Sequence, residues 1–482
     1  MSAIRPAAVV VLAAGEGTRM KSATPKVLHD ICGRSLVGHV LASARELEPE
    51  HLVVVVGHAR EKVTAHLAEV DAAARTAVQE KQNGTGHAVR MALEELGGPV
   101  DGTVVVVCGD TPLLTGRTLR SLASVHEQDG NAVTVLSAEV PDATGYGRIV
   151  RDGASGAVTA IVEHKDASEE QRAIREINSG VFAFDGRLLA DALGKVRTDN
   201  SQGEEYLTDV LGILREAGHR VGACVAGDHR EIAGINNRVQ LADARRTLND
   251  WLLTEAMLAG VTVVDPATTW VDVTVSFEQD VTVLPGTQLH GATHLGEGCT
   301  VGPNSRLTDT RVGRGARLDN TVSDGAVVGP EASVGPYAYL RPGTRLGLRS
   351  KVGTYVETKN ARIGEGTKVP HLSYVGDATI GDHSNIGAAS VFVNYDGQDK
   401  HHTTVGSHCR TGSDNMFVAP VTIGDGAYTA AGSVITRDVP PGSLAVARGQ
   451  QRNIEGWVAR KRPGSAAAKA AEAVSGEPGD GA

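Results

Sequence analysis

The stretch "TVSDGAVVGPEASVGPYAYLRPGTRLGLRSKV", residues 321–352, decides how the second half of the chain folds. An apolar residue recurs there at every sixth position, at Val322, Val328, Val334, Leu340, Leu346 and Val352. A six-residue period is typical of a parallel β-helix, in which each hexapeptide supplies one short strand and one turn. We therefore expect these side chains to point into the core of such a helix.

The same period appears in two further registers. One comprises Leu295, Val301 and Leu307, and the other Val405, Thr411, Phe417, Ile423, Thr429 and Ile435. Chance spacing of valine and glycine in a β-sandwich is the alternative, but six consecutive matches in one register, found twice, argue against it. The register breaks at "FVNYDGQDKHHTT", residues 392–404, where we expect a loop to leave the helix.

The first half of the chain alternates apolar runs with helical patterns. The runs "HLVVVVGH" at 51–58 and "TVVVVCGD" at 103–110 are typical of parallel strands buried on both faces. Helical patterns cover 59–70 and 86–96. This alternation predicts a mostly parallel, Rossmann-like sheet with helices on both sides, in which ligands bind at the carboxyl ends of strands.

A third pattern separates the two halves. Apolar residues at near-helical spacing run through "NNRVQLADARRTLNDWLLTEAMLAG", residues 236–260, and predict a connecting helix. We expect an α/β domain over 1–238, a helical linker over 239–259, a hexapeptide-repeat domain over 260–460 and, because the end of the chain is of low complexity, a disordered tail over 461–482.

Composition narrows the class of protein. The net charge of −10 argues against a general nucleic-acid binder, because phosphate contacts need clustered lysine and arginine. The five cysteines contain no C-x-x-C pair, which predicts a reducing compartment and neither a zinc site nor a disulfide framework. The apolar run at 7–14 has no cleavage site after it, so it predicts a strand rather than a signal peptide. We expect a cytoplasmic protein.

The segment "VVVLAAGEGTRMKSATPK", residues 9–26, runs from a strand into glycines and then to the cations Arg19 and Lys26. It predicts a phosphate-binding loop, but Met20 stands where a Rossmann fingerprint needs glycine and no Gly-Lys-Ser/Thr closes a Walker loop. The alternative is that the two cations are solvated surface charges. Asp110 follows a buried strand and either holds Mg²⁺ or caps a helix.

Several motifs, taken together, point to a family. The segments "LAAGEGTRM", "PKVLH", "GTGHAV", "GDTPLL", "TGYGRIV", "IVEHKDA", "NSGVF" and "INNRVQL" resemble nucleoside-triphosphate:sugar-1-phosphate nucleotidyltransferases. With "LRPG", "VETKNARIG", "HLSYVGDATIG", "NIGA" and "NYDG", the chain resembles the bacterial bifunctional N-acetylglucosamine-1-phosphate uridyltransferase/glucosamine-1-phosphate acetyltransferase family from about Val9 to Trp457.

The resemblance implies a left-handed parallel β-helix of hexapeptide repeats, assembled as a homotrimer. It implies acetyl transfer from acetyl-CoA to glucosamine-1-phosphate. Uridylyl transfer from UTP to N-acetylglucosamine-1-phosphate would follow, giving UDP-N-acetylglucosamine and pyrophosphate for cell-envelope precursors such as peptidoglycan. No nucleic acid or membrane partner is expected.

For uridylyl transfer, the resemblance implies that Arg19 and Lys26 are catalytic because they neutralise the departing pyrophosphate. It implies that Asp110 and Asn236 hold Mg²⁺. Gln79, Gly84 and Thr85 are expected to read the base, and Gly147, Glu163 and Asn178 are expected to bind the sugar. The full set of implied nucleotide and sugar contacts is Leu12, Ala13, Ala14, Gly15, Lys26, Gln79, Gly84, Thr85, Cys108, Gly109, Gly147, Glu163, Asn178 and Asn236.

For acetyl transfer, the resemblance singles out His371 as the base, ahead of four other histidines of the repeats at 383, 401, 402 and 408. Glu357 is expected to orient the His371 imidazole, and Pro370 departs from the family pattern. The implied acceptor-binding residues are Arg341, Lys359, Tyr374 and Asn385. The implied acetyl-CoA contacts are Ala388, Asn394, Tyr395, Ser413, Ala431 and Arg448.

Two other functions stay open at this point. A nucleotidyltransferase with a single activity could use the repeats only as a scaffold, and a regulatory subunit could carry both folds without catalysis. The presence of His371 and the "NYDG" loop argues against the first, and Arg19, Lys26 and Asp110 argue against the second.

Overall fold

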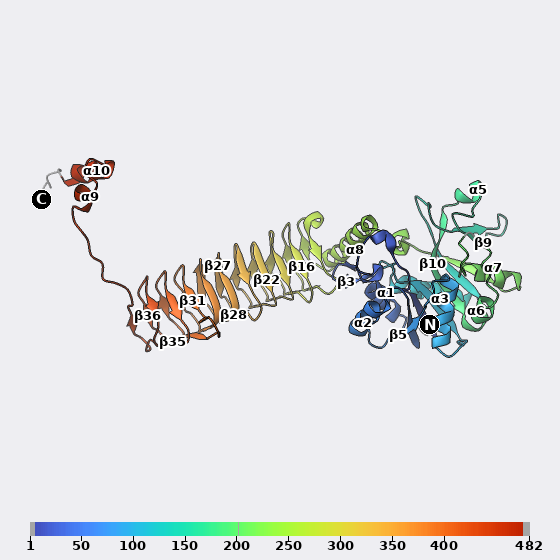
Figure 1. The fold of residues 1–482 in the computed structure, drawn as a ribbon, viewed down its shortest axis with the longest axis horizontal. Helices are drawn as coiled ribbons and strands as arrows, with labels where there is room; N and C mark the ends of the chain where they lie inside the picture. Colours follow the sequence, from blue (N-terminus) through green and yellow to red (C-terminus); the bar gives the residue numbers. More distant parts are fainter. Residues whose placement is uncertain (1–4, 201, 476–482) are drawn as a thin grey trace. The chain divides into compact units, whose positions relative to one another are not determined.

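The computed structural model describes residues 5–200 and 202–475 (Figure 1). It comprises two compact units, Met1–Glu331 and Ala332–Ala482. The first unit holds an α/β sheet, a long helix and the first repeats, and the second holds the remaining repeats. In the described residues, no helix is both long and apolar enough to cross a membrane.

The sheet of the first unit has the order β11-β7-β10-β6-β1-β4-β5. Its pairs are parallel except where β10 lies antiparallel to β6 and β7, which confirms a mostly parallel sheet. An antiparallel pair, β8–β9, extends from β10. The strands are β1 (Ala8–Leu12), β4 (His51–Val56), β5 (Arg75–Val78), β6 (Thr103–Cys108), β7 (Val133–Glu139), β8 (Arg148–Arg151), β9 (Val158–Val162), β10 (Glu176–Asp185) and β11 (Val221–Val225).

Side chains of the central strands alternate between two cores, one on each face of the sheet. Val9 and Val11 pack in one core, and Val10 packs in the other. Continuous apolar runs are needed for such strands because neither face meets water. The helices are α1 (Leu36–Arg45), α2 (Arg60–Val70), α3 (Thr85–Glu95), α4 (Gly116–Gln128), α5 (Glu169–Arg172), α6 (Gly186–Leu193) and α7 (Asp209–Glu216), and a hairpin pairs β2 (Asp30–Ile31) with β3 (Arg34–Ser35).

Helix α8 (Arg238–Leu258) leads from the sheet to the repeats of the same unit. The side chain of Asn237 caps it by accepting hydrogen bonds from the backbone N–H groups of Val239 and Gln240. Buried Asn249 fixes the first repeat, because its amide donates to the Thr269 carbonyl at 2.9 Å and accepts from the Val271 N–H at 2.9 Å. The domain limits given above remain predictions.

The repeats of the first unit stack short parallel strands, and equivalent residues recur about every eighteen positions. Leu289 pairs with Leu307, for example. The coil after Leu307 is shorter, so Leu307 pairs with Ser323 and the predicted inward residue Val322 is only half-buried. The strands are β12 (Thr262–Val263), β13 (Trp270–Val271), β14 (Ser276–Phe277), β15 (Thr282–Val283), β16 (Gln288–His290), β17 (His294–Leu295), β18 (Thr300–Val301), β19 (Arg306–Thr308), β20 (Arg311–Val312), β21 (Arg317–Leu318), β22 (Thr321–Asp324) and β23 (Val327–Val328).

The second unit continues the same pattern. Apart from Val322, the residues of the three predicted registers, in both units, are all buried, which confirms the hexapeptide period. Its strands are β24 (Ser333–Val334), β25 (Ala338–Leu340), β26 (Arg345–Leu346), β27 (Lys351–Thr354), β28 (Glu357–Ile363), β29 (Lys368–His371), β30 (Tyr374–Ile380), β31 (Val391–Val393), β32 (Thr403–Val405), β33 (Arg410–Thr411), β34 (Met416–Val418), β35 (Val421–Ile423), β36 (Tyr428–Thr429), β37 (Val434–Ile435) and β38 (Leu444–Ala445).

One coil carries an insertion. Ile380 pairs with Val405, and an antiparallel bridge between Tyr395 and Lys400 closes a loop between them. Strands β31 and β32 stay within the ladder, so the loop covers 394–402 and is narrower than the predicted 392–404. Two helices end the described chain, α9 (Trp457–Lys461) and α10 (Ala466–Ser475). Helix α10 lies where low complexity predicts disorder, and its alanines have the highest helix propensity; residues 476–482 lie outside the described residues.

Candidate functional site

The loop after β1 lies beside the loop after β6 because the two strands are neighbours in register. Leu12 pairs with Cys108, and the next residue, Gly109, donates its N–H to the Leu12 carbonyl at 2.9 Å. Gly17 has φ +63° and a Cβ there would lie 2.5 Å from the Lys26 Cβ, so the turn needs glycine. A Cβ at Gly15 would meet nothing within 4 Å, which leaves that backbone open to a ligand.

Four predicted residues meet at this edge of the sheet. The Lys26 ammonium forms an ion pair with the Asp110 carboxylate and lies 3.3 Å from the amide oxygen of Asn236. Arg19 donates to the same amide oxygen at 2.8 Å. The side chains of Lys26 and Asp110 are only 14% and 21% exposed. Lys26 is therefore part of a largely buried polar cluster, whereas Arg19 is exposed and joins the cluster through its hydrogen bond to Asn236.

The alternative role of Asp110 as a helix cap does not hold. Helix α4 is capped by Thr115, whose hydroxyl accepts from the Thr118 N–H at 3.2 Å. The backbone carbonyl of Asp110 instead accepts from the Ile235 N–H at 2.9 Å, which brings Asn236 to the cluster.

The oxygens of Asp110 and Asn236 also test the fit of a metal ion. Both side chains direct an oxygen at one positive charge, the Lys26 ammonium. Mg²⁺ prefers oxygen ligands and is commonly held by one or two protein groups while waters and phosphates complete the octahedron. Among the described residues, no group of three or more His, Cys, Asp or Glu side chains could hold a metal. The pair therefore fits Mg²⁺ bound together with phosphate.

The predicted base-binding residues lie at the start of α3. Gln79 is 4% exposed, and its amide donates to the Gly84 carbonyl at 3.0 Å and contacts His87 Nδ1 at 2.9 Å. Gly84 has φ +108°, and a Cβ there would lie 2.5 Å from the Glu205 carbonyl oxygen. Thr85 accepts from the Leu207 N–H at 3.0 Å. These contacts pack the predicted base-reading loop against residues 205–207.

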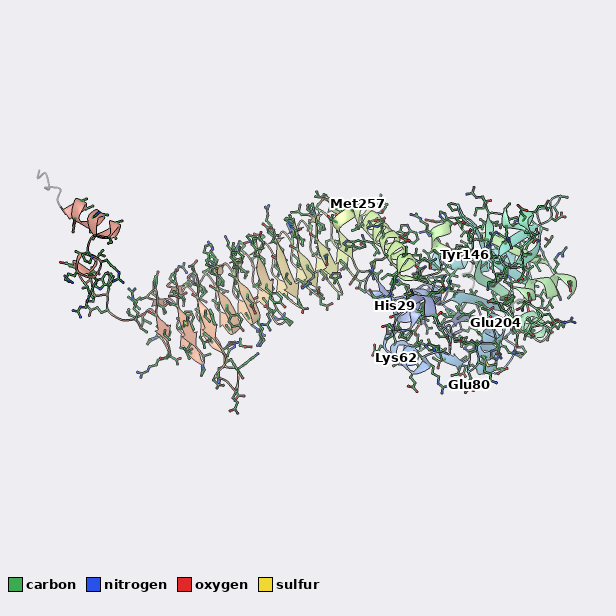
Figure 2. All side chains as sticks on the ribbon, turned by 45° about the horizontal axis from the view of Figure 1, so that its top comes forward. His29, Lys62, Glu80, Tyr146, Glu204 and Met257 are labelled. Atoms are coloured by element: carbon green, nitrogen blue, oxygen red, sulfur yellow. The ribbon has the colours of Figure 1, made fainter. Side chains whose placement is uncertain are left out.

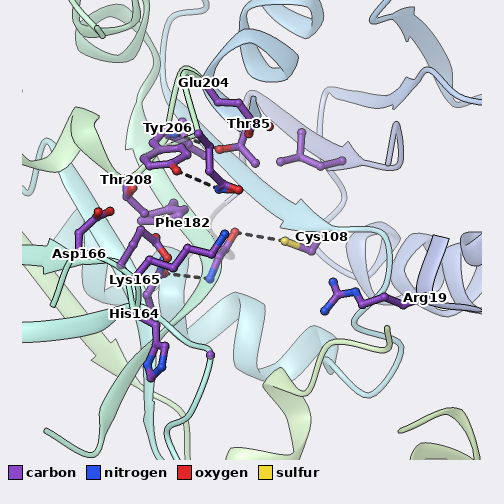
Figure 3. Close-up of a pocket in the computed structure, with 17 residues that line it drawn as sticks. Arg19, Thr85, Cys108, His164, Lys165, Asp166, Phe182, Glu204, Tyr206 and Thr208 are labelled. Atoms are coloured by element: carbon purple, nitrogen blue, oxygen red, sulfur yellow. Dashed lines mark hydrogen bonds between the residues drawn. The ribbon is translucent and has the colours of Figure 1, made fainter. Parts of the chain in front are cut away.

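A cavity of about 450 Å³ opens beside these loops (Figure 3). Its size is that of a small-molecule site. Six predicted residues line it: Leu12, Arg19, Thr85, Cys108, Glu163 and Asn178. Eleven further lining residues were not predicted: Gly145, His164, Lys165, Asp166, Gly180, Phe182, Gln202, Glu204, Tyr206, Leu207 and Thr208. The predicted residues that do not line it are Ala13, Ala14, Gly15, Lys26, Gln79, Gly84, Gly109, Asp110, Gly147 and Asn236.

The predicted sugar-binding residues gather at one side of this cavity. Asn178 donates its backbone N–H to the Gly147 carbonyl at 2.9 Å, and its side-chain oxygen accepts from the Gly180 N–H at 2.9 Å. Burial, with smaller contributions from Asp166 and Asp209, raises the pKa of Glu163. A carboxylate and an amide in this partly dry position suit hydrogen bonds with sugar hydroxyls.

A buried arginine contacts the segments that carry these residues. Arg148 is 2% exposed. Its guanidinium donates to the carbonyl of Tyr146, which is labelled in Figure 2, and to the Arg172 carbonyl at 3.4 Å. It also contacts His164 Nδ1 at 3.4 Å. Within the described residues, Arg148 Nε has no hydrogen-bond partner. The guanidinium thus ties together three segments that carry Gly147, Glu163 and the 172 turn, a role that no sequence motif had indicated.

The unpredicted lining residues Gln202, Glu204, Tyr206, Leu207 and Thr208 reach the cavity because Glu205, between them, pairs with a distant segment. Glu205 donates to the Asn83 carbonyl and accepts from the Gly86 N–H, both at 2.8 Å, and its carboxylate pairs with Arg90 at 2.5 Å. The run "EEYLTD" at 204–209 could have indicated a loop rich in polar residues. It does not indicate that this loop pairs with a loop more than one hundred residues away.

In the second unit, His371 ends β29, which pairs with β27 through Thr354 and His371. The imidazole is exposed and makes no hydrogen bond within the part of the chain that the structure describes. Glu357 was expected to orient it, but the Glu357 carboxylate accepts from Arg341 at 2.8 Å instead. The other histidines are engaged elsewhere: His383 stacks on His408, His401 pairs with Asp396, and His402 contacts Thr379.

Three predicted residues of this unit share one network. Lys359 lies 3.4 Å from the Asp377 carboxylate, which also accepts from the Asn394 amide at 2.5 Å. The Asn394 amide lies 3.4 Å from the Tyr374 hydroxyl. Asn385 joins the ladder between Lys368 and Arg410 by backbone bridges. The structure thus brings Lys359, Tyr374 and Asn394 together.

Small residues form a column along one corner of the coils. Asp414 donates to the Ala388 carbonyl at 2.7 Å, and Gly432, next to Ala431, donates to the Ser413 carbonyl at 2.9 Å. The predicted acetyl-CoA contacts Ala388, Ser413 and Ala431 thus lie on successive coils. Tyr395 is 56% exposed on the loop, and its hydroxyl donates to the Gly397 carbonyl at 2.7 Å. Arg448 is exposed and makes no side-chain hydrogen bond among the described residues.

Known proteins share both parts of the chain. A family model described as the MobA-like NTP transferase domain matches residues 9–179, and one described as the hexapeptide repeat of succinyl-transferase matches 402–437. The bifunctional protein GlmU of Streptomyces coelicolor is 87% identical over 477 residues, which is 99% of each chain. That of Streptomyces avermitilis is 88% identical over 478 residues, again 99% of each, and that of Thermobifida fusca is 64% identical over 475, 98% of each.

Proposed function

The chain belongs to the family of bifunctional GlmU proteins, and on this premise we propose that it catalyses two successive transfers. The first moves an acetyl group from acetyl-CoA to the amine of glucosamine-1-phosphate. The second moves a uridylyl group from UTP to the resulting N-acetylglucosamine-1-phosphate, giving UDP-N-acetylglucosamine and pyrophosphate. The observation that carries the proposal is the cluster of Arg19, Lys26, Asp110 and Asn236 beside a cavity of the right size.

In uridylyl transfer, a phosphate oxygen of the sugar phosphate attacks the α-phosphorus of UTP. The new oxygen–phosphorus bond forms as the bond to the β-phosphate bridging oxygen breaks and pyrophosphate leaves. Arg19 and Lys26 neutralise the charge that grows on the leaving group, because such reactions depend mostly on positioning and electrostatic stabilisation. Asp110 and Asn236 would hold Mg²⁺, which supplies positive charge to the triphosphate when bound.

The remaining groups of this site position the two substrates. Gln79, Gly84 and Thr85 form the expected base-reading loop, and Glu163 and Asn178 accept and donate hydrogen bonds to the sugar. The Lys26 ammonium has three N–H donors, of which two face Asp110 and Asn236, so a phosphate oxygen can accept the third.

In acetyl transfer, His371 accepts a proton from the amine as its nitrogen attacks the thioester carbonyl. The carbon–nitrogen bond forms, the carbon–sulfur bond breaks, and the proton passes to the departing thiolate of CoA. Arg341 and Lys359 bind the sugar phosphate. Asn394, Tyr395 and the column of Ala388, Ser413 and Ala431 receive acetyl-CoA, with Arg448 near its phosphates.

We also propose that the active form is a homotrimer in the cytoplasm that supplies cell-envelope precursors. The exposed His371 without a partner in its own described chain supports a site completed by a neighbouring subunit. The five free cysteines suit a reducing compartment.

The test incubates the purified chain with glucosamine-1-phosphate and acetyl-CoA, without UTP, and measures the mass of the product. The expected product is N-acetylglucosamine-1-phosphate. If it is absent while UTP and N-acetylglucosamine-1-phosphate still give UDP-N-acetylglucosamine, the repeats are a scaffold and the chain has one activity. Absence of both products would favour a regulatory subunit.

A further inference from the structure

We propose that Asp377 is a positioning residue that anchors both substrate sides of the acetyl-transfer site through one carboxylate. It lies 8% exposed on β30, inside the second unit. One of its oxygens, Oδ2, accepts from Asn394 at 2.5 Å and faces Lys359 at 3.4 Å. The other, Oδ1, accepts from Asn360 at 2.8 Å. The proposal rests on the function proposed above, in which Lys359 binds the sugar phosphate and Asn394 binds acetyl-CoA.

The network is built where successive coils stack. Lys359 on β28 lies opposite Gly376 on β30, and Asn394 directly follows β31 on the next coil. A Cβ on Gly376 would overlap the Tyr374 hydroxyl and lie 2.7 Å from the Asn394 amide nitrogen. The Tyr374 hydroxyl and the Asn394 amide therefore pack directly against the Gly376 backbone.

The charge of Asp377 stays in place at neutral pH. Burial alone would raise its pKa, but hydrogen bonds from Asn360 and Asn394, together with the Lys359 charge, hold the pKa below its usual value. A charged acceptor forms stronger hydrogen bonds than a neutral one. Without this carboxylate, the Lys359 ammonium loses its ion-pair partner, and the Asn394 amide keeps only the longer contact with the Tyr374 hydroxyl at 3.4 Å.

This arrangement makes a prediction that differs from that of a purely structural role. Lys359 and Asn394 contact different substrates in the proposed mechanism, so a change at either one alone should weaken the binding of mainly one substrate. A change at Asp377 should weaken the binding of both substrates. The backbone at Asp377 has φ +49°, a conformation that asparagine tolerates well, so Asp377→Asn keeps the turn and the size while it removes the charge.

The test measures binding of glucosamine-1-phosphate and of coenzyme A to the full chain by calorimetry, for the wild type and Asp377→Asn. We expect both dissociation constants to rise by about tenfold, in line with the loss of one charged hydrogen bond for each substrate. In steady-state acetyl transfer, both KM values should rise more than kcat falls. When Asn394 is already replaced by alanine, adding Asp377→Asn should raise the dissociation constant of coenzyme A no further.

Asp382→Asn is the matched control, because the exposed Asp382 carboxylate accepts from the backbone N–H of Glu365 at 2.7 Å and touches no predicted substrate residue. Uridylyl transfer by the same chain reports on its other site. Binding of both ligands within twofold of wild type in Asp377→Asn would overturn the proposal, and so would loss of the folded repeats, because the carboxylate would then serve the fold. Weakened binding without any acetyl transfer by the wild type would contradict only the proposed function.

Discussion

The guanidinium of Arg19 donates a 2.8 Å hydrogen bond to the amide oxygen of Asn236, although 217 positions separate the two residues. Asn236 directly precedes the cap of α8, and Arg19 lies in the turn after β1. The contact therefore joins the predicted phosphate-binding loop to the start of the helix that leads to the repeats. A polar cluster made in this way depends on the whole α/β sheet being folded.

Lys26→Ala should lower kcat for uridylyl transfer by about 100- to 1000-fold, because in the proposed mechanism the ammonium stabilises charge that develops in the transition state. Pyrophosphate release measures it. Lys21→Ala is the control, because Lys21 is exposed on the same loop. Equal losses in the two variants, or full activity in Lys26→Ala, would show that Lys26 has no catalytic role.

Arg148→Met should raise the KM for N-acetylglucosamine-1-phosphate by about tenfold and leave the KM for UTP nearly unchanged. The buried guanidinium holds the carbonyl of Tyr146, which precedes the predicted sugar contact Gly147, and a lost charged hydrogen bond of this kind costs about 1.5–3 kcal/mol. Arg151→Met is the control, because Arg151 lies on the same strand but its guanidinium pairs with Glu176, away from the cavity. A KM change of the same size for UTP would argue against specific support of the sugar side.

Gly353→Ala should destabilise the repeats by about 1–3 kcal/mol, as overpacking does. A Cβ at this position would overlap the Pro370 carbonyl oxygen and lie 2.7 Å from the carbonyl carbon, next to the predicted base His371. Acetyl transfer should lose thermal resistance before uridylyl transfer does. Gly212→Ala, where a Cβ meets nothing within 4 Å, is the control. Equal heat inactivation of both activities would contradict the expected local effect.

Asp71→Asn should reduce stability at neutral pH but not in acid. A hydrogen bond from Arg45 at 2.7 Å lowers the pKa of Asp71 below its ordinary value of 3.8. Because the pKa of Asp71 is lower in the folded protein than in the unfolded chain, the carboxylate contributes fully to the free energy of unfolding above pH 3.8. This contribution is lost as the pH falls through the pKa of Asp71 in the folded protein. The partly exposed pair should contribute about 1 kcal/mol or less.

Urea unfolding midpoints for wild type and Asp71→Asn, measured from pH 7 down to pH 3, test the Asp71 prediction. The gap between the two proteins should be constant near neutrality and close toward pH 3. A gap that widens in acid would mean that the carboxyl pKa is raised, not lowered.

The hexapeptide period could be read from the sequence because each coil places one side chain in the core at a fixed spacing. The period does not indicate where a coil is shorter, so Val322 was predicted at the core position that Ser323 occupies. The parallel strands of the α/β sheet were equally legible, because burial on both faces requires unbroken apolar runs.

The polar residues divide in the same way. Arg19 and Lys26 could be predicted because they follow a strand and a glycine turn within one segment. Arg148 and Asp377 could not, because each gains its role from carbonyls or amides on other segments. A buried charged side chain within a strand has no local signature in sequence. Its partners are set by tertiary pairing.

The central claim is that one chain carries two separate sites. The most direct measurement determines both activities in Asp110→Ala and in His371→Ala, each confirmed as folded by circular dichroism. We expect Asp110→Ala to lose uridylyl transfer and keep acetyl transfer. His371→Ala should lose acetyl transfer by about 100-fold or more and keep uridylyl transfer. Loss of both activities in either folded variant would contradict the account of two sites.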